Sequence, residues 1–142
     1  MSRRNASLLL LLVLTAIVAT YFAWPSKDEP LSIKLLDCPN PVAGCGDGGS
    51  MQMRFDHAPK ALQPFGIDLS LPTAEAVHMQ FTMDGMEMGT NRYRMVRRSD
   101  GTWHAEVTLP VCMHGRSDWL ALVEASMAGG TSYYQFRFSA ER

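Results

Sequence analysis

Most of the chain alternates apolar and polar residues over short runs. In an extended strand every second side chain lies on the same face, so a two-residue period predicts a half-buried β-strand. The segments with this pattern are 31–36, 51–56, 66–71, 76–83, 92–97, 102–109, 118–125 and 131–138. Proline or glycine ends most of these runs, and Ser99-Asp100-Gly101 is a hairpin turn signal between two of them.

About eight short strands separated by turns are typical of an all-β fold. We predict an antiparallel β-sandwich, with Greek-key connections between its strands. One segment has a second interpretation, because the apolar residues within 119–127 also fit one face of a helix. Residues 39–49 hold two prolines and four glycines and are therefore predicted to form a loop.

The N-terminal segment has a different pattern. Arg3 and Arg4 precede an uncharged, mostly apolar run of seventeen residues, 8–24, close to the ~20 residues that cross a bilayer as a helix. The arginines are expected on the cytoplasmic side, so residues 1–24 are predicted to be a membrane anchor and the remainder is exported. No site in this run has small residues at both positions that signal cleavage requires; a cleaved signal peptide is therefore the alternative.

These features predict three parts: the anchor, a polar linker at 25–30, and an exported domain at 31–142. In a bacterium, this arrangement places the domain in the periplasm, held by a single pass through the inner membrane. Without the two arginines near the N-terminus, eleven basic residues face fourteen acidic ones, a net charge of −3. There is no basic patch, so we do not expect nucleic acid as a partner.

The sequence contains three cysteines, Cys38, Cys45 and Cys112. An exported domain meets an oxidising compartment, which favours a disulfide and leaves one thiol over. Cys38 and Cys45 bracket a turn-rich segment and can pair locally, but either can also pair with Cys112. If Cys112 is the remaining thiol, it is a small buried residue or a soft metal ligand.

The segment 81–91 carries the most distinctive chemistry. Met83, Met86 and Met88 fall within six residues, with Gly85 and Gly89 among them. Thioether sulfur is soft and suits Cu(I), and glycines allow a loop to direct several sulfurs at one point. The alternatives are that these methionines fill the core or contact a partner, since methionine packs well into irregular gaps.

A second loop, 112–114, adds soft sulfur and an imidazole. A sandwich can bring its loops together at one end, and Cu(I) needs only about two to four such ligands. Met83 continues the apolar face of its strand and His78 lies on the polar face, so both rank below the loop residues. The predicted metal ligands are Met86, Met88, Met113 and His114, followed by Met83, Cys112 and His78.

Enzymatic motifs are absent: the sequence has no G-x-S-x-G, Walker loop, C-x-x-C pair or His-rich zinc motif. The spacing of Cys112 and His114 leaves a thiol-dependent redox role as a minor alternative. We therefore expect a binding protein rather than an enzyme.

The run Met83-Asp84-Gly85-Met86-Glu87-Met88-Gly89, in a membrane-tethered β-sandwich, resembles small exported domains of copper-handling and oxidase-assembly systems, including YtkA-like and FixH-like proteins. The resemblance covers about 31–138. It implies an immunoglobulin-like sandwich and a role in supplying or sensing copper. The expected function is that of a Cu(I)-binding accessory protein that passes copper to a partner protein. The alternative is a metal-free interaction domain that docks on a membrane complex through its Met-rich loop.

Overall fold

The computed structural model describes residues 13–15, 32–86, 91–111 and 115–141. The chain divides into two compact units, Met1–Pro30 and Leu31–Arg142. In the first unit only residues 13–15 are described, and they are helical. Within the described ranges, no helix has the length and apolar character needed to cross a membrane. Almost all of the predicted anchor, 1–24, lies outside the described residues.

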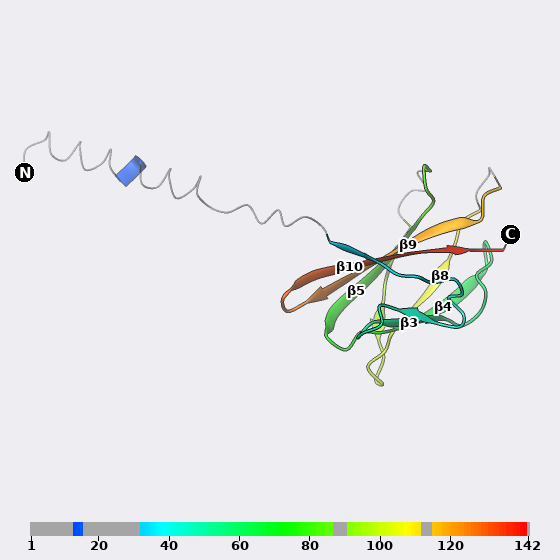
Figure 1. Ribbon diagram of the computed structural model, residues 1–142, viewed down its shortest axis with the longest axis horizontal. Helices are drawn as coiled ribbons and strands as arrows, with labels where there is room; N and C mark the ends of the chain where they lie inside the picture. The colour runs from blue at the N-terminus through cyan, green and yellow to red at the C-terminus, as the bar shows by residue number, and fades with distance from the viewer. Residues whose placement is uncertain (1–12, 16–31, 87–90, 112–114, 142) are drawn as a thin grey trace, which may run out of the picture. The chain divides into compact units, whose positions relative to one another are not determined.

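The second unit is a sandwich of two five-stranded sheets, as far as its residues are described (Figure 1). Sheet A has the order β1 (Ile33–Leu35), β10 (Gly130–Ser139), β9 (Asp118–Met127), β5 (Ala74–Thr82) and β6 (Arg92–Arg94). Sheet B has the order β2 (Cys45–Gly46), β3 (Gln52–Phe55), β4 (Pro64–Ser70), β8 (Trp103–Thr108) and β7 (Val96–Arg97). All neighbouring strands are antiparallel except β1 and β10. The predicted all-β sandwich is confirmed.

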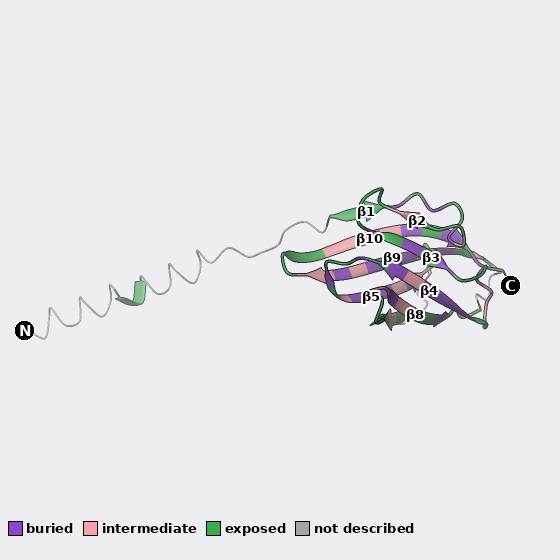
Figure 2. Ribbon diagram, turned by 90° about the horizontal axis from the view of Figure 1, so that it is seen from below, coloured by how far each residue is buried: buried purple, intermediate pink, exposed green. Residues whose placement is uncertain are grey.

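Alternation along the strands builds the core between the sheets. Figure 2 shows buried residues alternating with half-buried ones along β5 and β9. Met51, Met53 and Phe55 share one strand face and are almost completely buried, so these methionines pack in the core. Phenylalanines from both sheets meet there, with the ring centroid of Phe55 5.1 Å from that of Phe65 and 5.3 Å from that of Phe138. Burial of such large apolar side chains is the main stabilising term of the fold.

The ambiguous segment 119–127 is a strand. β9 pairs with β10 along one edge and with β5 along the other, so hydrogen bonds to both neighbours satisfy its backbone. Trp119, Ala121, Val123 and Ala125 point into the core in a two-residue period. The segment also fitted a helical pattern because both faces of β9 carry apolar residues. Those of the inner face are in the core, and those of the outer face are half-buried.

The single strand predicted at 92–97 is divided between the two sheets. β6 pairs with β5 in sheet A, whereas β7 pairs with β8 in sheet B. Met95 lies at the change of sheet; it is 2% exposed, and its N–H donates to the Val77 carbonyl at 2.9 Å. The crossing closes one side of the sandwich with a short, arginine-rich edge, which discourages pairing with another chain.

A disulfide joins Cys38 to Cys45, with their Cα atoms 5.3 Å apart. Of the pairings that the sequence left open, the structure has the local one. The loop between the two cysteines ends in β2, a two-residue strand that pairs with β3 and that the proline and glycine content did not predict. The disulfide therefore links the segment that follows β1 to β2, the edge strand of sheet B.

Replacing both Cys38 and Cys45 with serine should lower the free energy of unfolding by about 2–3 kcal/mol, because the bridge restricts the unfolded chain over a short loop. Chemical denaturation of the oxidised protein and of the variant measures this difference. Reduction of the unmodified protein should produce a loss of the same size. Equal denaturation midpoints in all three samples would contradict the expectation.

Candidate soft-metal site at one end of the sandwich

The Met-rich segment begins in a tight turn at the end of β5. The Met86 N–H donates to the Met83 carbonyl at 3.1 Å, which closes a four-residue turn. Gly85 has a φ of 71° at the third position, where a side chain would be strained. Met83 is 3% exposed and belongs to the core, while Met86 is half-buried and packs against it. The turn therefore places one thioether inside the sandwich and one at its surface.

Arg116, two residues after the second predicted loop, contacts this turn. β5 and β9 pair with Thr82 opposite Leu120, so the chain leaves β5 where it enters β9. Nη1 of Arg116 donates to the Asp84 carbonyl oxygen at 2.7 Å. The start of the first segment is therefore in direct contact with a residue that follows the second segment, at one end of sheet A.

Two arginine–aspartate pairs surround the turn. Arg116 donates to both carboxylate oxygens of Asp118, with Nε 2.9 Å from Oδ1. Arg137 donates from Nη2 to Oδ2 of Asp84 at 3.1 Å. The Arg116 guanidinium holds the pKa of the Asp118 carboxyl below its usual value, with Arg137 adding a smaller effect of the same sign. Each of the two aspartates beside the turn is therefore paired with an arginine.

A mainly apolar pocket of about 280 Å³ opens next to the turn. Met83 and Trp119 line it from the core, and Arg116 and Glu141 contribute polar atoms. Leu62 and Val111 also line the pocket and are 67% and 53% exposed. Leu62 has a φ of 61°, an unfavourable conformation for a leucine. Exposed apolar side chains around an apolar pocket are typical of a contact surface.

The far side of the Met-rich segment returns to the core at Asn91. This residue is 8% exposed, and its carbonyl accepts the Phe81 N–H at 2.9 Å. Its side-chain Nδ2 has no hydrogen-bond partner among the described residues. A buried polar group is thus held at the base of the segment, where the chain enters β6.

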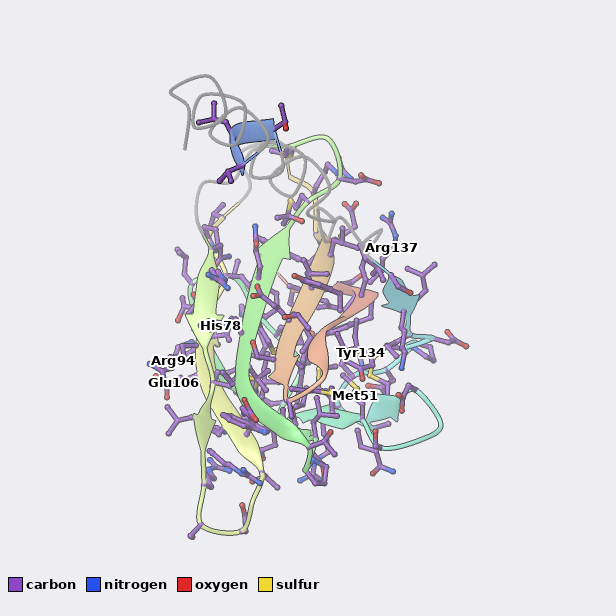
Figure 3. The ribbon with its side chains drawn as sticks, turned by 90° about the vertical axis from the view of Figure 1, so that its left-hand side faces the viewer. Met51, His78, Arg94, Glu106, Tyr134 and Arg137 are labelled. Atoms are coloured by element: carbon purple, nitrogen blue, oxygen red, sulfur yellow. A yellow bond between two sulfur atoms is a disulfide. The ribbon has the colours of Figure 1, made fainter. Side chains whose placement is uncertain are left out.

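The remaining predicted ligands have different outcomes. Met88, Cys112, Met113 and His114 lie outside the described residues. His78 lies on the outer face of β5, opposite Glu124 and beside Arg94 (Figure 3). It is five residues before Met83, or about 16 Å along an extended strand, and its side chain is on the other face. The structure therefore brings Met83 and Met86 together but does not bring His78 to them.

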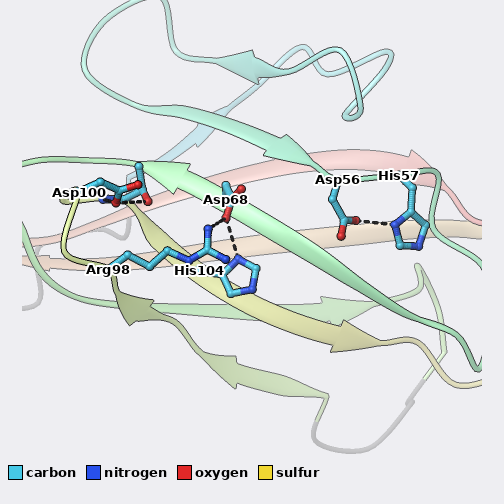
Figure 4. Close-up of polar contacts among 7 residues, drawn as sticks. Asp56, His57, Asp68, Arg98, Asp100 and His104 are labelled. Carbon is cyan, nitrogen blue, oxygen red and sulfur yellow. Dashed lines mark hydrogen bonds and ion pairs between the residues drawn. The ribbon is translucent and has the colours of Figure 1, made fainter.

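A polar cluster that the sequence analysis did not identify lies on the outer face of sheet B. Oδ1 of Asp68 lies 2.7 Å from Nδ1 of His104 and accepts from Nη1 of Arg98 at 2.8 Å (Figure 4). Figure 4 also shows a second pair, in which Oδ1 of Asp56 lies 2.7 Å from Nδ1 of His57. Sequence alternation places Asp68 on the polar face of β4 and His104 on the polar face of β8. Only the strand register makes the two residues neighbours.

Across residues 13–15, 32–86, 91–111 and 115–141, no three His, Cys, Asp or Glu side chains are grouped so that they could hold a metal ion. The turn of residues 83–86 (the Met turn) carries thioethers, which are a separate class of ligand. The end of sheet A where this turn lies is therefore the candidate site.

Alanine substitutions separate the packing role of the two turn methionines. Met83→Ala should lower the free energy of unfolding by about 2–4 kcal/mol, because it leaves a cavity in the core. Met86→Ala should cost less than about 1 kcal/mol, since its side chain is only half-buried. Denaturation of both variants without added metal tests this difference. Similar costs at the two positions would show that Met86 is also a core residue.

Comparison with models of protein families, with curated proteins and with solved structures finds no match to this chain.

Proposed function

We propose that the protein is a Cu(I)-binding accessory protein of the bacterial periplasm, anchored in the inner membrane by residues 1–24. Its exported domain is an immunoglobulin-like sandwich of the YtkA-like or FixH-like type. It binds one Cu(I) at the end of sheet A and passes the ion to a partner protein during copper delivery or oxidase assembly.

The hydrogen bond between Arg116 and the Asp84 carbonyl carries the proposal. It holds the Met turn against the segment that leads from residues 112–114 into β9. The Met-rich segment and residue 116, two positions after the second region of soft side chains, are therefore in contact, which supports a shared site. Thioethers and imidazole are ligands that Cu(I) accepts, and few are needed.

The ligand set in this proposal contains Met86 and, from outside the described residues, Met88, Met113 and His114. The proposal has two reserve sulfur donors: Met83, which belongs to the core, and Cys112, which lies outside the described residues. Met86 is half-buried rather than enclosed, which suits a site that must release its ion to a partner. A fully buried thioether such as that of Met79 offers no such access.

Titration of the full-length protein with Cu(I), under reducing conditions and against a competing chelator, tests the function. We expect one ion per chain, and we expect the Met86→Ala, Met88→Ala double variant to bind at least about tenfold more weakly. Met127→Ala is the matched control, since Met127 is a half-buried methionine at the opposite end of β9. Affinity weaker than about micromolar for the unmodified protein would exclude the proposal.

A second candidate function is a metal-free interaction domain that docks on a membrane complex. The exposed side chains of Leu62 and Val111 around the apolar pocket favour it. An apolar centre with charged residues around it is the usual anatomy of a protein interface. In this function, the Met-rich segment is an adaptable contact surface.

Leu62→Asn distinguishes the two functions. Asparagine tolerates the left-handed backbone at this position, so the variant should fold normally while losing the apolar contact. For a docking domain, cross-linking to membrane partners should fall severalfold and should not respond to copper chelation. For a copper carrier, chelation should reduce the cross-linking and Cu(I) affinity should be unchanged by the substitution.

A further inference from the structure

Sulfur also gathers at the edge of sheet B, within the described residues. The register places Cys45 of β2 directly opposite Met53 of β3, and opposite residues of an antiparallel pair have their side chains on the same face. Met51 precedes Met53 by two positions, and both methionines are buried. The disulfide joins Cys38 to Cys45. Two cysteines and two methionines therefore lie on neighbouring segments at this edge.

We propose that Cys38 and Cys45, once reduced, form a Cu(I) site of two thiolates, which the disulfide closes. Cysteine thiolates are soft ligands that select Cu(I), and hard cations need oxygen ligands instead. In the oxidised chain the two sulfurs are bonded to each other, so neither is available as a thiolate. This site is separate from the one proposed at the end of sheet A and does not depend on it.

Hydrogen bonds hold Cys45 in place without the disulfide. In the turn between β2 and β3, Oδ1 of Asp47 accepts the Gly49 N–H at 2.9 Å and the Met51 N–H at 3.1 Å. The Asp47 N–H donates to the Met51 carbonyl at 3.2 Å. At Gly46 a Cβ would lie only 2.3 Å from that same carbonyl oxygen, so the absence of a side chain lets the two strands meet. The hairpin that carries Cys45 is therefore closed by its own contacts.

The segment after Cys38 is also held independently of the disulfide. Oδ1 of Asn40 accepts the Val42 N–H at 3.1 Å, which forms a local turn. The carbonyl of Pro41 accepts the Phe55 N–H at 2.9 Å, which attaches the segment to β3. Reduction should therefore leave the two thiols close to their present arrangement, in which the Cα atoms are 5.3 Å apart. Ligands that are already in place bind an ion without the cost of ordering a loop.

The position of the pair allows exchange with a partner. β2 has only two residues and is the last strand of sheet B. Such short edge pairings, with few hydrogen bonds, open locally at low cost. Cys45 is half-buried, whereas Cys38 is 5% exposed. Cys45 is therefore the residue that an incoming thiolate reaches first.

Opening the site takes two electrons, which a partner dithiol supplies. One thiolate of the dithiol attacks Sγ of Cys45, the bond to Cys38 breaks, and Cys38 leaves as a thiolate. The second thiolate of the partner then breaks the mixed disulfide, which releases Cys45 as a thiolate and leaves the partner oxidised. Cu(I) takes the place of the protons that the two thiolates would otherwise bind. In the reverse exchange, the thiolates pass two electrons to a partner disulfide, re-form their bond and release Cu(I) unchanged.

The test uses the full-length Cys112→Ser protein in detergent, in which Cys38 and Cys45 are the only cysteines. Ascorbate keeps copper as Cu(I) without reducing the disulfide, so the single ion expected for the proposed function is that of the oxidised chain. One sample keeps the disulfide, and the other is reduced with a phosphine that is then removed. Against a competing chelator, the reduced sample should bind one more Cu(I) per chain and show the ultraviolet charge-transfer band of Cu(I)–thiolate.

Equal numbers of ions in the two samples would overturn the proposal. So would a reduced sample that has lost the β-sheet circular dichroism of the oxidised one, because the proposed site needs the folded loop. The Cys38→Ser, Cys45→Ser variant in the same background should bind no additional ion. Alkylation of both thiols in the reduced sample gives the same comparison without a substitution, and an additional ion that persists after alkylation would exclude the two thiolates as ligands.

The Met86→Ala, Met88→Ala variant in this background separates the two sites. Absence of Cu(I) from the oxidised protein would remove the proposed function at the end of sheet A, but it would not change the difference between reduced and oxidised samples. We expect this variant to gain the same additional ion on reduction. Loss of the additional ion would show that the cysteines do not form a site of their own.

Discussion

The antiparallel pairing of β5 with β9 is the interaction on which the arrangement of this protein depends. These strands form the middle of sheet A, and their register places Thr82 opposite Leu120. Because one strand ends where the other begins, the Met turn and the segment before β9 are forced to the same end of the sandwich. The contact between Arg116 and Asp84 is a consequence of that register. Loss of the register would separate the two segments, whatever their own conformations.

The described methionines differ in how deeply they are buried. Met51, Met53 and Met79 are buried and serve the core, where a flexible side chain fills gaps between phenylalanine rings. Met86 is half-buried at the surface of the turn. Methionine thus has two roles in this protein, and the burial of each side chain indicates which role it has. Charge is also organised around this turn, since each nearby aspartate is paired with an arginine.

Sequence alternation was a reliable guide to the strands because each one buries a single face. It predicted the inward residues of β5 and the strand nature of most segments, but it could not resolve 119–127, where both faces are partly apolar. It also treated 92–97 as one strand, although Met95 carries the chain from one sheet to the other. The pairing of Asp68 with His104 was not predictable, since the two residues are 36 positions apart and no local pattern links them.

Local pattern by itself determined the all-β class, the turn at Gly85 and the concentration of soft side chains in two segments. These properties depend on neighbouring residues, whose side chains alternate or turn for steric reasons. Only the tertiary structure decided the choice of disulfide, the meeting of the two segments and the pairing of Asp84 and Asp118 with arginines. The meeting of the segments and the pairing of Asp84 with Arg137 depend on strand register between distant parts of the chain, which is set by the packing of the whole core. The disulfide and the pairing of Asp118 with Arg116 are local, but sequence alone left them as one choice among several.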